Sequence, residues 1–156
     1  MRIIVEKDYH AMSKKAALMV ASQITLKPNS NLGLATGGTP RAMYDKLIEM
    51  YREDEIDFSE VQTFNLDEYC GLEADHPNSY HFYMNDNFFN EINIKKENIH
   101  IPDGSAEDFA RECRDYEESI KKARGIDLQI LGIGSNGQLE FKEPAESLKV
   151  ATEVVD

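Results

Sequence analysis

The feature that most constrains this chain is the segment from Leu32 to Pro40, which reads Leu-Gly-Leu-Ala-Thr-Gly-Gly-Thr-Pro. It begins as an apolar run, breaks at two adjacent glycines and restarts at Thr39-Pro40. Threonine favours the N-cap of a helix, and proline favours the first helical position. Apolar residues then recur at helical spacing: Ala42, Met43, Leu47, Ile48 and Met50. The segment therefore predicts a strand, a glycine turn and a helix, in that order.

This glycine turn has the composition of an anion site. Because glycine has no Cβ, the backbone N–H groups of Gly37 and Gly38 can approach a ligand closely, and the start of a helix adds partial positive charge. The hydroxyl groups of Thr36 and Thr39 would complete the cradle. A purely geometric turn is the alternative interpretation. No lysine follows the glycines, so the segment is not a nucleotide-binding P-loop.

The rest of the chain alternates strand-like and helix-like segments. The expected strands cover residues 2–6, 32–34, 61–66, 98–101 and 126–131. The expected helices begin at Asp8, Thr39, Ser79 and Ser105. This order predicts an α/β fold with a mainly parallel, Rossmann-like sheet flanked by helices in three layers, α/β/α. Since no linker, repeat or low-complexity segment interrupts the pattern, we expect one domain over residues 1–156.

Three of these helices have an expected buried side. In the first helix it consists of Met12, Ala16, Val20 and Ile24. The helix expected over residues 79–92 is rich in aromatic residues, which favours core packing. In the last helix, which a capping box at Ser105–Asp108 would open, it consists of Phe109, Cys113, Tyr116 and Ile120.

Composition excludes several classes of function. The net charge of −12 disfavours nucleic acid and anionic membranes as partners. No apolar run approaches the ~20 residues that span a bilayer, and the N-terminus lacks a secretory signal pattern. The two cysteines, Cys70 and Cys113, are too few for a disulfide framework and form no metal-ligand pair. We therefore expect a cytoplasmic protein that uses no metal or other cofactor.

Ligands of parallel sheets bind at the carboxyl ends of the strands, where two further loops carry unusual residues. Asp67 and Glu68 follow the strand expected over 61–66, and such acids serve either as a general base or as caps of a turn. The loop from Gly132 to Gln138 contains G-x-G-x-x-G, a dinucleotide-binding pattern. No clear helix begins at Gly137, and Pro144 interrupts soon afterwards. NAD binding is therefore disfavoured.

Together these segments resemble the glucosamine-6-phosphate deaminase family. Six blocks occur in the family's order, within residues 1 to about 137: 34–40, 64–69, 76–80, 98–102, 125–129 and 131–134. The resemblance implies the same α/β fold. It also implies conversion of glucosamine 6-phosphate and water to fructose 6-phosphate and ammonia, without a cofactor and with a sugar phosphate as the partner.

The resemblance also implies residue roles. Thr36–Thr39 match the family's phosphate loop, and Asp67 matches the base that moves a proton between the first two carbons of the sugar. Asn136 matches a position that helps to organise ring opening. Glu143 matches a carboxylate that tunes the ring-opening histidine. One base and a separate acid–base relay can hold different proton affinities.

The resemblance breaks down after Gly137. Gln138 stands where the family has its ring-opening histidine, and an amide cannot exchange a proton near neutral pH. Glu140 replaces a glycine, and the chain stops at Asp156, short of the family's length. We therefore expect a truncated, engineered or degenerate deaminase-like domain, with the tail 138–156 altered, that lacks efficient catalysis and retains a weak sugar-phosphate site. An active deaminase is the alternative.

The tail is expected to cover the surface that truncation leaves open. Glu140 and Lys142 alternate with Leu139 and Phe141, as in a half-buried strand, and a final strand is expected over Lys149–Val155. With that cover in place, the chain would remain a monomer or a small homo-oligomer.

Overall fold

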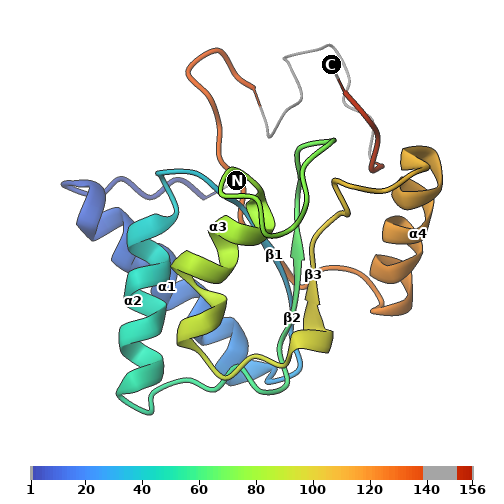
Figure 1. Ribbon diagram of the computed structural model, residues 1–156. Coiled ribbons are helices and arrows are strands. Elements are labelled where there is room, and N and C mark those ends of the chain that lie inside the picture. Colours follow the sequence, from blue (N-terminus) through green and yellow to red (C-terminus); the bar gives the residue numbers. More distant parts are fainter. Residues whose placement is uncertain (1, 139–150, 156) are drawn as a thin grey trace.

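The computed structural model describes residues 2–138 and 151–155. The described residues contain four parallel strands: β1 (Asn31–Leu34), β2 (Gln62–Asn65), β3 (Ile99–His100) and β4 (Leu128–Gln129). They also contain the helices α1 (Tyr9–Leu26), α2 (Arg41–Arg52), α3 (Tyr80–Asn87) and α4 (Phe109–Lys122). Two short 3₁₀ helices, η1 (Phe89–Glu91) and η2 (Lys96–Asn98), lie between α3 and β3. Figure 1 shows α1, α2 and α3 on one side of the sheet and α4 on the other, which confirms the expected α/β layers.

The strand order of the sheet is β3-β2-β1-β4. The chain moves outward from β1 through β2 to β3, and then crosses by way of α4 to β4 on the opposite side of β1. Leu34 of β1 is in register with Asn65 of β2, and Gly33 is in register with Gln129 of β4. The loops after β1 and β4 therefore leave the sheet where the strand order reverses, which is the preferred ligand position in such folds.

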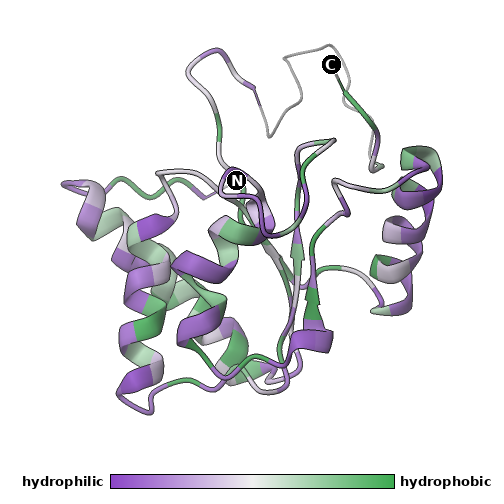
Figure 2. Ribbon diagram, in the orientation of Figure 1, coloured by the Kyte–Doolittle hydropathy of each residue, from purple (hydrophilic) through white to green (hydrophobic). Residues whose placement is uncertain are grey.

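The main core lies between β1 and the helices α1 to α3. All four residues of β1 are buried, as expected for a central parallel strand covered on both faces. Tyr44 of α2 stacks on Phe88, with ring centroids 4.7 Å apart, and Phe88 meets Phe58 edge-on at 5.5 Å. Figure 2 shows the apolar residues of the strands and the largely hydrophilic surface of α4. The core thus fixes β1 and α2, the two elements that flank the glycine turn.

The strand expected over residues 2–6 does not form. Ile3 and Val5 are 74% and 87% exposed, and the described sheet offers this segment no neighbouring strand. Its apolar residues therefore have β-propensity but nothing to pair with. The buried side of α1 also differs from the expected one. Met12 is 41% exposed, and the buried residues of this helix, which packs against α2, are Ser13, Ala17, Val20, Ala21 and Ile24.

Two helix starts agree with the sequence, those of α1 and α3. Asp8 caps α1 by accepting a hydrogen bond from the amide of Ala11 (2.7 Å), and Ser79 caps α3 by accepting from Phe82 (3.0 Å). Thr39, by contrast, is not the N-cap of α2: Pro40 takes that position without a side-chain bond. The capping box at Ser105–Asp108 is also wrong, because Asp108 itself caps α4 through the amide of Arg111 (2.9 Å).

Several elements are shorter than expected. α3 ends at Asn87 and gives way to η1, so residues 79–92 are not one helix, and Phe82 is 40% exposed rather than part of the core. The strand expected over 126–131 is reduced to β4, Leu128–Gln129. The residue pairs with β1 are limited to Leu128 and Gln129, although the amides of Asp127 and Ile130 on either side still donate to the carbonyls of Asn31 and Gly33 (both 2.8 Å).

The tail is described only over residues 151–155, and these do not form the expected strand. Thr152 is bound instead by α4: its amide and hydroxyl both donate to Oε1 of Glu117, at 2.7 and 2.8 Å. The amide of Thr152 thus donates to a side chain of α4 and not to a neighbouring strand. The expected alternation over Leu139–Lys142 and the candidate residue Glu143 lie outside the described residues. In the described part of the chain, none of the helices is long and apolar enough to cross a bilayer.

Candidate functional site

The glycine turn lies between the end of β1 and the start of α2. Gly37 has φ +94°, in the left-handed region that a side chain would strain, so this position requires glycine. Gly37, Gly38 and Thr39 are exposed, whereas Ala35 before them is buried. The turn therefore presents its backbone to solvent at the end of a buried strand, and strand, turn and helix follow in the predicted order.

Tyrosine hydroxyl groups from three helices hold the carbonyl oxygens of this turn. Tyr44 of α2 donates to the carbonyl of Ala35 (2.6 Å), and Tyr83 of α3 donates to that of Gly37 (2.6 Å). The hydroxyl of Tyr9 in α1 lies 3.0 Å from the carbonyls of both Gly38 and Thr39. Sequence reasoning missed these tyrosines, because they belong to helices whose packing around the turn only the fold reveals.

The two acids after β2 have different environments. The side chain of Glu68 is 1% exposed and caps the start of α3. It accepts hydrogen bonds from the amides of Tyr69 (2.8 Å), Tyr80 (2.9 Å) and His81 (3.0 Å), and Nδ1 of His81 lies 3.0 Å away. Burial is the largest effect and raises the pKa of Glu68, but these four bonds together outweigh it and leave the pKa lowered. Glu68 is therefore the capping member of the pair.

Asp67 is half-buried, and its charge acts on two tyrosine hydroxyl groups. Burial, with the charge of Asp67 among the smaller causes, raises the pKa of both Tyr80 and Tyr116. The hydroxyl of Tyr80 also interacts with the hydroxyl of Thr36 in the glycine turn and with that of Tyr69, 3.5 Å away. Tyr80 thus connects the loop after β2 with the glycine turn. The loop of Asp67 and the glycine turn therefore lie at the same edge of the sheet.

The loop after β4 folds back on itself. Oδ1 of Asn136 accepts from the amide of Gln138 (3.0 Å), and the amide of Gly134 donates to the carbonyl of Gln138 (2.8 Å). Asn136 is exposed and Gln138 is half-buried. Figure 1 shows this segment, in orange, beyond the end of the sheet to which the strand arrows point, the same end at which β2 enters the loop of Asp67.

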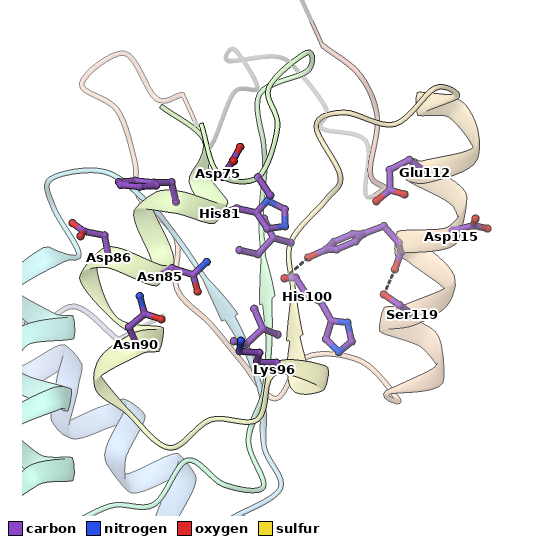
Figure 3. Close-up of a pocket in the computed structure, with 15 residues that line it drawn as sticks. Asp75, His81, Asn85, Asp86, Asn90, Lys96, His100, Glu112, Asp115 and Ser119 are labelled. Atoms are coloured by element: carbon purple, nitrogen blue, oxygen red, sulfur yellow. Dashed lines mark hydrogen bonds between the residues drawn. The ribbon is translucent and has the colours of Figure 1, made fainter. Parts of the chain in front are cut away.

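A cavity of about 860 Å³ opens at a different place, along β3 between α3 and α4. Figure 3 shows Asn85, Asp86 and Asn90 on the α3 side, and Glu112, Asp115 and Ser119 on the α4 side. His100 stacks on Phe64, with ring centroids 4.4 Å apart, and burial lowers the pKa of its imidazole, which favours the neutral form. With four acids in its lining, Asp75, Asp86, Glu112 and Asp115, this cavity does not suit an anion.

Neither cysteine forms a disulfide in the part of the chain that the structure describes. Cys70 is exposed and Cys113 is half-buried, and both are free thiols. Within residues 2–138 and 151–155, no three His, Cys, Asp or Glu side chains are arranged to hold a metal ion.

The fold and these loops define an α/β domain of Rossmann-like type, with a glycine turn and the loop of Asp67 at the carboxyl end of its parallel sheet. A family model described as glucosamine-6-phosphate isomerases/6-phosphogluconolactonase matches residues 6–138. The chain is 64% identical over 155 residues to a glucosamine-6-phosphate deaminase of Thermoanaerobacter sp. (strain X514), covering 99% of this chain and 61% of that protein. It is 61% identical over 156 residues to the deaminase of Halothermothrix orenii, covering all of this chain and 65% of the relative. The chain belongs to the glucosamine-6-phosphate deaminase family.

Solved structures of related proteins have the same fold as this chain. A monomeric glucosamine-6-phosphate deaminase superimposes with a TM-score of 0.91 and 46% identity, covering 94% of this chain and 61% of that one. A 6-phosphogluconolactonase from Thermotoga maritima shares the fold, with a TM-score of 0.73 at 23% identity, covering 89% of this chain and 62% of that one. The chain spans less than two thirds of the length of these proteins.

Proposed function

We propose that this chain binds glucosamine 6-phosphate at the carboxyl end of its sheet and deaminates it only slowly. The observation that supports the binding is the turn from Thr36 to Thr39, which is exposed from Gly37 onward and follows a buried strand where the strand order reverses. Membership of the deaminase family supports this ligand over other anions. The net charge of −12 means that local dipoles, not the overall field, must hold the phosphate.

The chemistry follows from the position of Asp67. With the phosphate on the turn, the sugar would extend toward the loop after β2, where this half-buried carboxylate could move a proton between the first two carbons. Tyr80 would keep the two loops together through Thr36. We assign Asn136 to ring opening and Glu143 to tuning of that step, by resemblance to the family.

Gln138 limits the reaction. Ring opening needs a group that can accept and return a proton near neutral pH, and an amide cannot do so. Loss of a general acid–base group costs about 10²- to 10⁴-fold in rate. We therefore propose a sugar-phosphate-binding domain of low activity, with residues 1–156 as one domain, in the cytoplasm, as a monomer or small homo-oligomer and without a metal or cofactor.

The test measures ammonia release and calorimetric binding of glucosamine 6-phosphate for the wild type and for Gln138→His. We expect both to bind the ligand, and the histidine variant to release ammonia about 10²-fold faster or more, because it regains a titratable group. Asp67→Asn in the Gln138→His background is the control and should abolish that gain. Equal ammonia release by the wild type and the histidine variant would contradict the proposal.

A second candidate is a fully active deaminase. The identity of 61–64% to curated deaminases over the whole chain favours it. Ammonia release by the wild type at an ordinary enzymatic rate, unaffected by Gln138→His, would decide for this alternative.

A further inference from the structure

The carbonyl oxygens of the glycine turn are held in a way that determines where its amides point. In a planar trans peptide, the N–H of a residue points opposite to the C=O of the residue before it. The carbonyls of Gly37 and Gly38 are bound by Tyr83 (2.6 Å) and Tyr9 (3.0 Å). Their partners across the peptide bond are the amides of Gly38 and Thr39. Each hydroxyl therefore aims one N–H group away from its own helix.

The amides so aimed are available to a ligand. In the described part of the chain, neither the amide of Gly38 nor that of Thr39 donates to another residue, and both residues are exposed. Tyr44 acts in the same way on the carbonyl of Ala35, and hence on the amide of Thr36, but Tyr44 is completely buried and stacked in the core. Tyr9 and Tyr83 are the partly exposed members of this set.

Tyr9 has a second task. Besides donating to the turn, its hydroxyl accepts a hydrogen bond from the amide of Ala42 (3.2 Å). This amide lies in the first turn of α2, where Pro40 supplies no side-chain cap. One hydroxyl group from α1 thus fixes both the last peptides of the turn and the start of the helix that follows it.

We propose that Tyr9 and Tyr83 are positioning residues for the phosphate: through the carbonyls of Gly37 and Gly38 they hold the amides of Gly38 and Thr39 toward the bound anion. The inference rests on the proposed function, since it needs a phosphate at this turn. Neither tyrosine touches the phosphate in this account. Their effect is to remove the freedom that two adjacent glycines would otherwise give to the backbone.

The experiment compares Tyr9→Phe and Tyr83→Phe with the wild type in the binding of inorganic phosphate and of glucosamine 6-phosphate. Each change removes one hydroxyl and keeps the ring. We expect Kd for both ligands to rise by the same factor, about three- to tenfold, which is the typical net effect of one hydrogen bond. In the free protein, the amide NMR signals of Thr39 in Tyr9→Phe and of Gly38 in Tyr83→Phe should shift.

The matched control is Tyr51→Phe, at the other end of α2, where the ring packs edge-on against Phe58. It should leave Kd and the signals of the turn unchanged. Unfolding in urea measures any general loss of stability, which alone would not move these two amide signals. Unchanged Kd in both variants while the wild type binds phosphate would overturn the positioning role and leave the proposed function standing. No binding of either ligand by the wild type would overturn both.

Discussion

At the scale of single residues, the structure separates two acids that their spacing alone presents as equivalent. Asp67 and Glu68 were both predictable as strand-end carboxylates. Which of them caps a helix was not predictable, because two of the three amides that bind Glu68 belong to Tyr80 and His81, twelve and thirteen positions later. The cap could be assigned only once α3 was seen to begin beside the loop.

Glu68→Gln should destabilise the fold. The change replaces one of the two buried carboxylate oxygens that accept from the amides of α3 by an NH₂ group, which cannot accept. We expect this to cost about 1–3 kcal/mol in the free energy of unfolding. The measurement is urea denaturation at neutral pH. Asp75→Asn, an exposed acid of the same loop, is the control and should change little.

The same variant has a predicted pH dependence. Because the folded pKa of Glu68 is lowered from its ordinary value of 4.5, the stability it contributes is complete above pH 4.5 and is lost as the pH falls through the folded pKa. The difference in stability between wild type and Glu68→Gln should therefore shrink in acid. A difference that grew as the pH fell would contradict this assignment.

At the scale of elements, α4 illustrates what periodicity can and cannot predict. The spacing of Phe109, Cys113, Tyr116 and Ile120 correctly predicted a helix. It did not predict their burial: Tyr116 is buried, and the other three are half-buried. Residues of α4 and of β3 line the cavity together (Figure 3), and the Tyr116 hydroxyl is hydrogen-bonded to the ends of two strands. Sequence spacing does not reveal such a cavity.

Tyr116→Phe should weaken the attachment of α4. The hydroxyl donates to the carbonyls of Asn65 (2.7 Å) and His100 (3.2 Å), and so joins the ends of β2 and β3. Its loss leaves a buried carbonyl without that donor, which costs about 1–3 kcal/mol in the free energy of unfolding. Ser119→Ala is the control. Its hydroxyl bonds within the helix to the carbonyl of Tyr116, so urea denaturation should show a smaller loss. Equal losses would disprove the role given to Tyr116.

At the scale of the whole molecule, the class of fold was predictable and the strand order was not. Alternating apolar segments indicate parallel strands linked by helices. The position of β4 beside β1 depends on a crossover past two strands, which no local pattern records. The side chain of Asp127 helps to fix the position of β4. Asp127, just before β4, binds Lys27 at the end of α1 through both carboxylate oxygens (2.8 and 2.7 Å) and accepts from the amide of Asn31 (2.8 Å).

Asp127→Asn should therefore loosen the closure between α1, β1 and β4. The hydrogen bond from Lys27, followed by that from the amide of Asn31, lowers the pKa of Asp127, so its contribution is complete above pH 3.8 and is lost as the pH falls through the folded pKa. Because the side chains of Lys27 and Asp127 are 44% and 25% exposed, solvent screens the pair, and we expect a loss of only about 1 kcal/mol in the free energy of unfolding.

Lys27→Met separates the two contacts of that carboxylate. It removes the ion pair but keeps the bond to the amide of Asn31, so its cost in urea denaturation at neutral pH should be smaller than that of Asp127→Asn. Added salt should reduce the cost of Lys27→Met further, because the screened ion pair is what that variant lacks. The hydrogen bond from the amide of Asn31 to Asp127 is short and partly buried. The part of the cost of Asp127→Asn that comes from losing this bond should therefore persist in salt. If Lys27→Met cost as much as Asp127→Asn at every salt concentration, the ion pair alone would hold β4 in place, and the bond to Asn31 would carry no weight.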